Sequence, residues 1–381
     1  MFVQKIDPAN LTAYLTALHS DKGGIHIMAK KGEQFFFKIY RLKTQAALIL
    51  KQDCLSLGAE FATPKEAILF KEPYQDGILI ANQKHLELLI KKCQTQPFGL
   101  KELAQTLKSY LKTPSQPLQL MGIINANEDS FYDKSRFLGE NALWRIEEMI
   151  KEGAHIIDIG AASTRPGSDW VSEEEELKRI QPIAKAIQES RLFERVKFSI
   201  DTYNPSVAEL CLDCGFSLIN DITALKNPRM VSLAKERQCE VVIMHMQGES
   251  PRLMQQNPHY ENVIEAVDRF FVERIETLHE SGVIQITLDV GIGFGKSVEH
   301  NLKLIRHLSH FKRFGLPLLV GASRKSLIHA LSPSMTEERL PGTLILHAEA
   351  YKAGASLIRC HDVKEHAQAF KILQALESTE A

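Results

Sequence analysis

VKFSIDTYNPSVAELCLDCGFSLIN, residues 196–220, contains the unit that decides the fold. An apolar run ends at Asp201, a segment with helical spacing follows over 205–214, and a second apolar run ends at Asn220. Each run has the length of a strand buried on both faces, and the segment between them has the length of a crossover helix. The stretch therefore predicts a βαβ unit whose strands both end in a polar side chain.

Six further apolar runs surround this unit, and all eight end in polar residues. In chain order they are LQLMGII with Asn125, HIIDIG with Ser163, Thr164 and Arg165, VKFSI with Asp201, SLIN with Asn220, EVVIMH with His245, QITLD with Asp289, PLLVG with Ser323, Arg324 and Lys325, and ASLIR with His361. Helical spacing follows the runs over 140–152, 172–190, 205–214, 227–238, 261–281, 297–314, 336–354 and 362–377. Eight alternations over 116–381 predict a (β/α)8 TIM barrel, whose active site lies at the carboxyl ends of the strands. A doubly wound open sheet is the alternative, and the regular polar strand ends favour closure.

The composition limits the classes of protein that fit. With 381 residues, 44% of them hydrophobic, the chain can bury one large core and a smaller second one, so we expect two domains. A formal net charge of −1 gives no general attraction to nucleic acid or to an anionic membrane, so recognition of an anion needs a local cluster of cations. No secretory signal and no run of ~18 apolar residues stands out, so we expect a cytoplasmic protein without a membrane partner.

A proline-containing segment separates two predicted domains. Lys112-Thr-Pro-Ser-Gln-Pro117 has the composition of a linker. We therefore expect a small α/β domain over 1–112 and the catalytic barrel over 116–381. The expected elements of the small domain are strands at GIHIMA (24–29), QFFFKIY (34–40) and DGILIA (76–81) and helices at 44–58, 83–93 and 99–111. Since the small domain contains no motif with a catalytic rationale, we expect it to serve packing, oligomer contacts or a partner.

Taken together, the strand-end motifs resemble dihydropteroate synthase, a pterin-binding barrel family of the folate pathway. The stretches that carry the resemblance are MGIINANEDSF (121–131), DIGAASTRPGS (158–168), SIDTYNP (199–205), INDI (219–222), MHMQG (244–248), LDVGIGFGK (288–296), GASRKS (321–326) and RCHDV (359–363). One such stretch would be weak, but eight in order are highly specific. The resemblance implies a transferase that joins 6-hydroxymethyl-7,8-dihydropterin diphosphate to p-aminobenzoate.

Residues at three strand ends suit a pterin. A pterin ring presents a guanidine-like edge of N–H and amino donors, from which a carboxylate can accept two hydrogen bonds. The resemblance assigns this edge to Asp289, with Asp201 and Asn220 around the ring. The two acids could instead bind a divalent metal directly, but their spread over separate strands and the amide at 220 favour hydrogen bonding to a heterocycle.

The glycine-rich stretch Gly291-Ile-Gly-Phe-Gly-Lys296 looks like a phosphate-binding loop, but its spacing fits neither nucleotide-binding pattern. We expect its glycines to let the backbone approach a flat ligand, and a plain loop remains the alternative. The resemblance implies that Phe294 lies near the ring and the p-aminobenzoate pocket. It also places Met244 under the pterin, although a methionine in a strand is usually a core residue.

A second group of residues suits anions. The turn at Ser323–Ser326 is expected to open the seventh barrel helix, where backbone N–H groups and Lys325 favour an anion. The resemblance uses Lys325 and Ser326 for the pterin carbonyl and the p-aminobenzoate carboxylate. Arginines at nearby strand ends give forked contacts that suit a diphosphate. The further substrate and diphosphate contacts implied here are Ser163, Thr164, Arg165, Arg359 and His361.

The resemblance also implies a metal ion and a mechanism. It makes Asn125 a neutral oxygen ligand of Mg²⁺, which is held as well by the substrate diphosphate and by water. The amine of p-aminobenzoate displaces diphosphate at the exocyclic CH₂, and Asp129 stabilises the developing cation. Asp129 and Phe131 belong to a loop that helps to form the p-aminobenzoate pocket. This loop departs from the family pattern Val-Thr-Pro-Asp-Ser-Phe, because its first three residues are Ala126-Asn-Glu128.

Two other functions fit part of this pattern. A pterin-dependent methyltransferase shares the pterin-edge acids but needs no diphosphate clamp. A non-catalytic or regulatory paralogue would keep the pterin pocket and lose p-aminobenzoate through the altered loop. We expect the synthase, with two small-molecule substrates as its partners, and the resemblance implies a homodimer.

Overall fold

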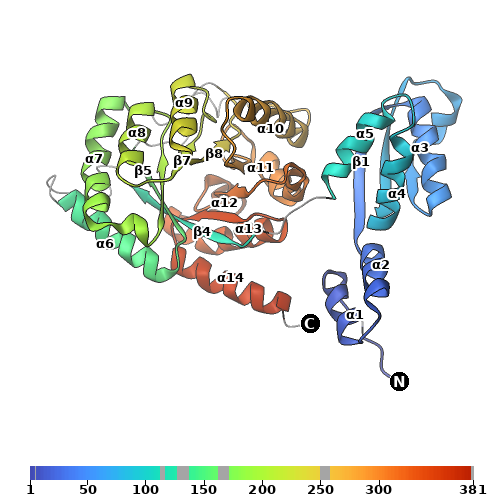
Figure 1. The fold of residues 1–381 in the computed structure, drawn as a ribbon, viewed down its shortest axis with the longest axis horizontal. Coiled ribbons are helices and arrows are strands. Elements are labelled where there is room, and N and C mark those ends of the chain that lie inside the picture. The colour runs from blue at the N-terminus through green and yellow to red at the C-terminus, as the bar shows by residue number, and fades with distance from the viewer. Residues whose placement is uncertain (5, 112–115, 127–136, 162–170, 249–257, 379–381) are drawn as a thin grey trace. The chain divides into compact units, whose positions relative to one another are not determined.

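The computed structural model describes the chain except for residue 5 and residues 112–115, 127–136, 162–170, 249–257 and 379–381 (Figure 1). It divides into two compact units. The first is Met1–Pro114 with Arg313–Gly315 and Gln374–Ala381, and the second is Ser115–Lys312 with Leu316–Leu373. Among the described residues, no helix combines the length and the apolarity needed to span a bilayer.

The second unit is a closed barrel of parallel strands with helices around its outside, which confirms the predicted fold (Figure 1). The eight strands, in their order around the barrel, are β4 Gln119–Asn125, β5 Ile156–Gly160, β6 Lys197–Asp201, β7 Leu218–Asp221, β8 Glu240–Met244, β9 Ile286–Asp289, β10 Leu318–Val320 and β11 Leu357–Cys360. The ring closes where β11 pairs with β4, with Arg359 beside Met121. Each strand coincides with one of the apolar runs, so the described polar residues at the ends of these runs stand at or next to the carboxyl ends of the strands.

The helices follow the strands along the chain, and residues 313–314 and 374–378 at the ends of two of them are assigned to the first unit. They are α6 Phe137–Glu152, α7 Glu173–Ser190, α8 Pro205–Asp213, α9 Pro228–Arg237, α10 Val263–Glu280, α11 Val298–Arg306, α12 Ser326–Leu331, α13 Leu340–Lys352 and α14 Val363–Ser378, with short 3₁₀ segments η3 Leu192–Glu194, η4 Leu308–Phe314 and η5 Thr336–Arg339.

Between β10 and β11 the helical prediction was wrong in detail. The helix expected over 336–354 is divided into η5 and α13, and Ser326 opens the separate six-residue helix α12. Helix α12 ends because Ser332, which precedes a proline, takes an extended backbone with φ −140° and ψ 100°. The helix expected over 297–314 is likewise broken at His307, between α11 and η4.

An apolar layer fills the barrel interior below its carboxyl end. Its side chains come from six strands and are almost completely buried: Met121, Ile156, Leu218, Val242, Leu319 and Leu357. A packed layer of this kind makes the barrel a solid core rather than a pore. It therefore forms a rigid floor for side chains that lie further along the same strands.

The first unit contains an antiparallel sheet in the order β1-β3-β2. Its elements are β1 Gln34–Lys43, β2 Glu60–Ala62, β3 Tyr74–Asn82, α1 Leu11–Ala17, α2 Lys22–Gly32, α3 Thr44–Leu57, α4 Gln83–Cys93 and α5 Leu100–Ser109, with η1 Pro8–Asn10 and η2 Lys65–Leu69. Buried leucines of α3, β3, α4 and α5 form its core. The predicted strands at 34–40 and 76–81 and the three predicted helices are confirmed.

The strand predicted at GIHIMA (24–29) was wrong, because this segment lies inside α2. Asp21 caps the helix by accepting a hydrogen bond from Gly24 N–H at 3.1 Å. Ile25 and Ala29, four residues apart, are partly covered, whereas Ile27 is exposed. The apolar residues therefore follow helical spacing, and the apparent alternation did not indicate a strand.

Candidate active site

A polar layer lies directly above the apolar floor of the barrel. Residues two positions apart on a strand share a face, so the residues that follow the floor by two positions also point inward. On β5, β7 and β11 these residues are Asp158, Asn220 and Arg359, and on β8 the residue is Met244. Three of the six strands of the floor thus change from an aliphatic to a polar side chain within one step toward the carboxyl end.

Asp158 joins the strands of this layer. Its fully buried carboxylate accepts hydrogen bonds from Ser199 Oγ at 2.5 Å, Asn220 Nδ2 at 3.1 Å and Arg359 Nε at 2.6 Å. Arg359 Nη2 also donates to Asp201 Oδ2 at 2.8 Å, so one guanidinium pairs with two carboxylates. Sequence reasoning gave Asp158 no role. The available signal was a carboxylate in the middle of the apolar run HIIDIG, where burial requires a partner.

Three strand-end side chains offer hydrogen-bond acceptors. A carboxylate can only accept, so the amide nitrogen of Asn220 faces Asp158 and its Oδ1 is the acceptor that remains. Asp201 Oδ1 is buried and has no hydrogen-bond partner among the described residues. Asp289 Oδ1 accepts from Gly291 N–H at 2.7 Å, which fixes the orientation of this carboxylate. The set suits a flat heterocycle that presents several N–H donors.

Burial makes the ionised forms of Asp201 and Asp289 less stable. It raises the pKa of Asp201 to about 7, since desolvation and the neighbouring Asp158 outweigh the attraction of Arg359. Burial also raises the pKa of Asp289, while the Gly291 N–H, Lys325 and Lys296 oppose the shift. A ligand that donates hydrogen bonds to either carboxylate would stabilise its ionised form, so binding of such a ligand offsets the cost of burying the acids.

The glycine-rich loop is held against the end of β8. A Cβ atom at Gly291 would lie 2.0 Å from the carbonyl oxygen of His245, and one at Gly295 would lie 2.7 Å from that of Gln247. Gly291 and Gly295 therefore let the loop approach protein backbone, and the approach of the loop to a flat ligand stays a prediction. The buried Lys296 Nζ donates to the carbonyl oxygens of His245, Gly291 and Phe294 at 2.9–3.0 Å. Burial lowers the pKa of Lys296 to about 7. The side chain is nevertheless charged here, because only an ammonium group has three N–H donors for the three carbonyl oxygens.

The loop presents an aromatic ring beside the acceptors. Phe294 packs with Met244 and Ile222 in a buried apolar cluster, against which Tyr203 also lies. Lys325 Nζ lies 4.2 Å from the centre of the Phe294 ring, a cation–π distance. The structure thus brings Met244, Phe294 and Lys325 to one side of the mouth.

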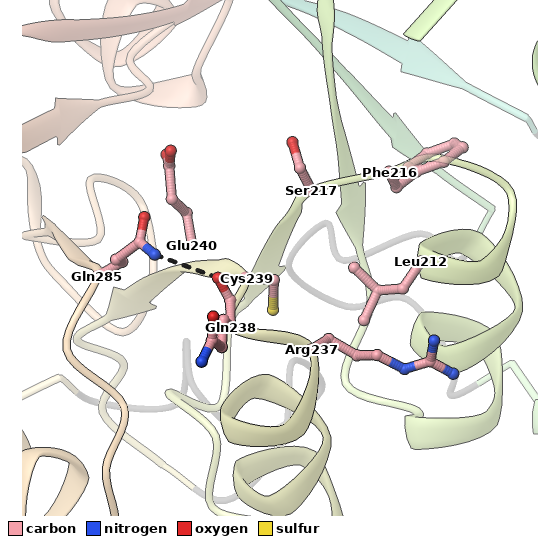
Figure 2. Close-up of a pocket in the computed structure, with 8 residues that line it drawn as sticks. All are labelled: Leu212, Phe216, Ser217, Arg237, Gln238, Cys239, Glu240 and Gln285. Carbon is pink, nitrogen blue, oxygen red and sulfur yellow. Dashed lines mark hydrogen bonds between the residues drawn. The ribbon is translucent and has the colours of Figure 1, made fainter. Parts of the chain in front are cut away.

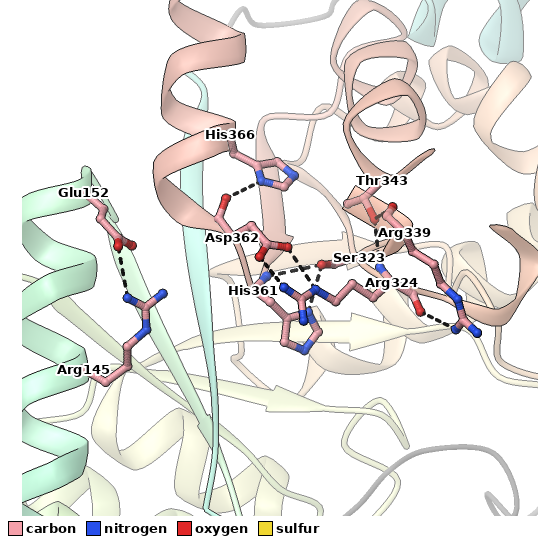
Figure 3. A network of polar contacts seen from close by, with 9 residues as sticks. All are labelled: Arg145, Glu152, Ser323, Arg324, Arg339, Thr343, His361, Asp362 and His366. Atoms are coloured by element: carbon pink, nitrogen blue, oxygen red, sulfur yellow. Dashed lines mark hydrogen bonds and ion pairs between the residues drawn. The ribbon is translucent and has the colours of Figure 1, made fainter. Parts of the chain in front are cut away.

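The turn after β10 meets the turn after β11 (Figure 3). Ser323 Oγ lies 2.9 Å from His361 Nδ1, and Arg324 forms a forked ion pair with Asp362. Lys325 precedes α12, whose first residue is Ser326. With only six residues, α12 has a small dipole, so attraction of an anion to this turn depends mainly on Lys325 and His361.

Other predicted site residues lie outside the described residues or elsewhere. Asp129, Phe131, Ser163, Thr164 and Arg165 belong to segments that the structure does not describe. Asn125 ends β4 with a half-buried side chain. His245, which was expected at the mouth, packs against the rings of Tyr260 and Phe270, the latter on α10. The prediction was wrong for this side chain, because successive residues of a strand point to opposite faces and Met244, the preceding residue, points inward.

A pocket of about 340 Å³ lies at the opposite end of the barrel (Figure 2). It is lined by Leu212, Phe216, Ser217, Arg237, Gln238, Cys239, Glu240 and Gln285, which lie around the amino ends of β7, β8 and β9. Its charged side chains are already paired, Glu240 with Lys197 and Arg237 with Asp213. Chemistry in barrels of this type lies at the carboxyl ends. We therefore place the active site at the polar strand ends.

The chain resembles known proteins over the barrel and beyond it. The family model described as pterin binding enzyme matches residues 121–361. Dihydropteroate synthase of Escherichia coli is 42% identical over 259 residues, 67% of this chain and 90% of that protein. The bifunctional dihydropteroate synthase/dihydropteroate reductase of Helicobacter pylori is 44% identical over 381 residues, the full length of both chains.

Solved structures agree with this resemblance. A Yersinia pestis dihydropteroate synthase in complex with a sulfonamide drug has a TM-score of 0.64 and 40% identity, over 69% of this chain and 95% of that one. Xanthomonas albilineans dihydropteroate synthase with 4-aminobenzoic acid has a TM-score of 0.64 and 33% identity, over 70% of this chain and all of that one.

The closed barrel, together with the family model that matches residues 121–361, places the chain in the class of pterin binding enzymes. The matched model covers all described members of the polar layer. Within this class, the chain belongs to the dihydropteroate synthase family.

We expect Asp289→Asn to weaken pterin binding by about 1–3 kcal/mol, because a charged acceptor is lost. The asparagine oxygen can still accept from Gly291 N–H, so the loop should stay in place. Calorimetry with a hydroxymethylpterin lacking diphosphate measures the effect. Asp221→Asn is the matched control, since Asp221 is a buried acid whose oxygens accept from Thr223 and Leu225. Unchanged affinity in Asp289→Asn would remove Asp289 from the site.

His245→Phe is expected to change the pH dependence of stability. Burial lowers the pKa of His245 to about 2, whereas the unfolded chain takes up the proton near pH ~6.5. The contribution of His245 to the free energy of unfolding is therefore complete above pH ~6.5. Below that pH it decreases by about 1.4 kcal/mol for each pH unit. Buried acids with a raised pKa act in the opposite direction and cancel in the comparison with the variant. Urea unfolding should show the wild-type advantage shrinking from pH ~6.5 downward, and a constant difference contradicts this reasoning.

Proposed function

We propose that this chain condenses 6-hydroxymethyl-7,8-dihydropterin diphosphate with p-aminobenzoate to give 7,8-dihydropteroate and diphosphate. One observation carries the proposal: the acceptors of Asp201, Asn220 and Asp289 lie at the same barrel mouth as Lys325 and His361. Acceptors suit the donor edge of the pterin, and cations suit the diphosphate.

In this proposal the residues act mainly by positioning and electrostatics. Asp289, Asp201 and Asn220 orient the pterin, while Met244 and Phe294 cover its face. Lys325 and Ser326 contact the pterin carbonyl and the p-aminobenzoate carboxylate. Arg359 and His361 stabilise the departing diphosphate. Asp129, Phe131, Ser163, Thr164 and Arg165 complete the site as the resemblance implies.

We also propose that Asn125 contributes to a Mg²⁺ site. The described residues contain no group of three or more His, Cys, Asp or Glu side chains that could hold a metal. A single amide oxygen fits Mg²⁺ when substrate phosphates and waters provide the other ligands. Bound there, the ion would neutralise charge that develops on the leaving diphosphate.

Product formation by the purified full chain tests the function. We expect dihydropteroate to form from both substrates, and addition of EDTA to stop the reaction until excess Mg²⁺ is restored. Pterin binding without product would favour a non-catalytic paralogue, and methyl transfer from a methylpterin would favour the methyltransferase. Light scattering during gel filtration would test the homodimer that the resemblance implies.

A second candidate activity is reduction of dihydropteroate. The observation in its favour is the full-length similarity to the Helicobacter pylori protein, which includes the first unit, whereas similarity to the Escherichia coli synthase covers 67% of the chain. The reaction would add a hydride and a proton across a C=N bond of the dihydropterin ring, with reduced nicotinamide or reduced flavin as donor. It competes with our expectation that residues 1–112 do no chemistry.

Incubation of the full chain with dihydropteroate and each donor in turn decides between these expectations. Stoichiometric formation of tetrahydropteroate with oxidation of the donor would support the reductase. Absence of turnover with every donor, in protein that makes dihydropteroate, would leave the first unit without a chemical role.

A further inference from the structure

An ion pair links the two turns that carry the proposed anion-binding residues. Arg324 donates from Nε to Asp362 Oδ2 at 3.1 Å and from Nη2 to Oδ1 at 2.5 Å, a forked contact (Figure 3). Arg324 lies between Ser323 and Lys325, and Asp362 follows His361. The pair therefore joins the turn after β10 to the turn after β11 at the positions next to the candidate ligands.

The backbone of Arg324 is held in an unusual conformation. Its φ is +56°, a left-handed value that costs a residue with a Cβ about 1–2 kcal/mol. Helix α13 and the segment before it support this conformation: Arg324 N–H donates to Thr343 Oγ1 at 3.0 Å, and its carbonyl accepts from Arg339 Nη1 at 3.0 Å. Such strain persists where the surroundings fix it, and it is common near functional sites.

Two buried histidines, His347 and His366, also connect these two turns through hydrogen bonds. Ala322 N–H donates to His347 Nε2 at 2.9 Å, so the proton of His347 is on Nδ1. That group donates to His366 Nε2 at 2.8 Å, and His366 Nδ1–H donates to the carbonyl oxygen of Asp362 at 2.6 Å. Both rings are fully buried, and burial lowers both pKa values, so the pair stays neutral. These hydrogen bonds connect residue 322 to residue 362, which are the sequence neighbours of Ser323 and His361.

We propose that the Arg324–Asp362 ion pair, supported by His347 and His366, positions Ser323 and His361 to receive the diphosphate of the substrate. The inference rests on the proposed function. Arg324 and Asp362 are positioning residues, because the charge of each is paired with the charge of the other. Loss of the pair would let the two turns separate, and a displacement of about 1 Å at a binding group can cost on the order of 100-fold in rate.

Single and double variants of the pair test this. We expect Asp362→Asn and Arg324→Gln to weaken binding of inorganic diphosphate about 10-fold to 100-fold and to raise KM for the pterin diphosphate. The affinity for a hydroxymethylpterin without diphosphate should stay unchanged. The double variant should be no worse than either single one, since both remove one interaction. Arg324→Lys, which keeps the charge but loses the fork, should be intermediate and is the variant to use if the others do not fold.

A pair of the same type elsewhere on the barrel is the control. Arg145 and Glu152 on α6 pair at 3.1 Å, with similar exposure, and contact none of the candidate ligands among the described residues (Figure 3). Glu152→Gln should lower the melting temperature without changing diphosphate affinity. If Asp362→Asn, Arg324→Gln and Arg324→Lys behave like Glu152→Gln, the pair is only structural and the inference is wrong. Wild-type protein that neither binds diphosphate nor forms dihydropteroate overturns the proposed function itself.

Discussion

Arg359→Ala is expected to lower the free energy of unfolding by about 3–5 kcal/mol and to abolish pterin binding, because it leaves buried charges without their partner. The guanidinium holds Asp158, which is completely buried, and Asp201, which is 5% exposed. Without the guanidinium, Asp158 and Asp201 repel each other. Asp158 also loses a hydrogen bond that holds its carboxylate, and this carboxylate is the acceptor that keeps Asn220 in place. Urea unfolding and calorimetry with a pterin lacking diphosphate measure the two effects.

His361→Ala separates this structural effect from loss of a diphosphate contact. The ring of His361 lies beside Ser323, with Nδ1 2.9 Å from the hydroxyl oxygen, whereas the guanidinium of Arg359 holds two buried acids. We expect it to reduce turnover and diphosphate retention while the pterin affinity and the stability change little. From sequence alone, Arg359 and His361 were expected to behave alike. Wild-type pterin affinity in Arg359→Ala would restore that expectation and contradict the role of Arg359 in the polar layer.

Much of the barrel could be predicted because local pattern determines it. Strands buried on both faces need continuous apolar runs, and the chain must leave the barrel at their carboxyl ends, where polar residues can be solvated or bind a ligand. Asp201, Asn220 and Asp289 stand out for this reason. The same logic failed at GIHIMA, where a cap by Asp21 and helical spacing determined the structure.

The interior contacts could not be predicted, because they depend on closure of the barrel. Asp158 and Arg359 are 201 residues apart, and only the pairing of β11 with β4 and of β4 with β5 brings their strands close together. The sequence could assign Arg359 to a diphosphate but contained no local sign that it also holds two acids. In the same way, the histidine line from Ala322 to Asp362 joins turns and helices that only the tertiary fold brings together.

Gly291→Ala is expected to destabilise the protein by about 3 kcal/mol or more, because a methyl group there meets the protein backbone. The Cβ would lie 2.0 Å from the carbonyl oxygen of His245, at a residue whose φ is +69°. The loop would have to move, and with it the Gly291 N–H that orients Asp289 and one of the carbonyl oxygens that hold Lys296. Pterin affinity should therefore fall together with stability.

Gly315→Ala is the matched control for this change. Gly315 has the same φ of +69°, but nothing lies within 4 Å of the position its Cβ would take. It should cost only the strain of a left-handed alanine, about 1 kcal/mol, and leave pterin affinity unchanged. The difference between the two variants in urea unfolding isolates the contact with His245. Equal losses would mean that the loop can move away from β8 at little cost, and the rigid placement of Asp289 and Phe294 by this loop would then be wrong.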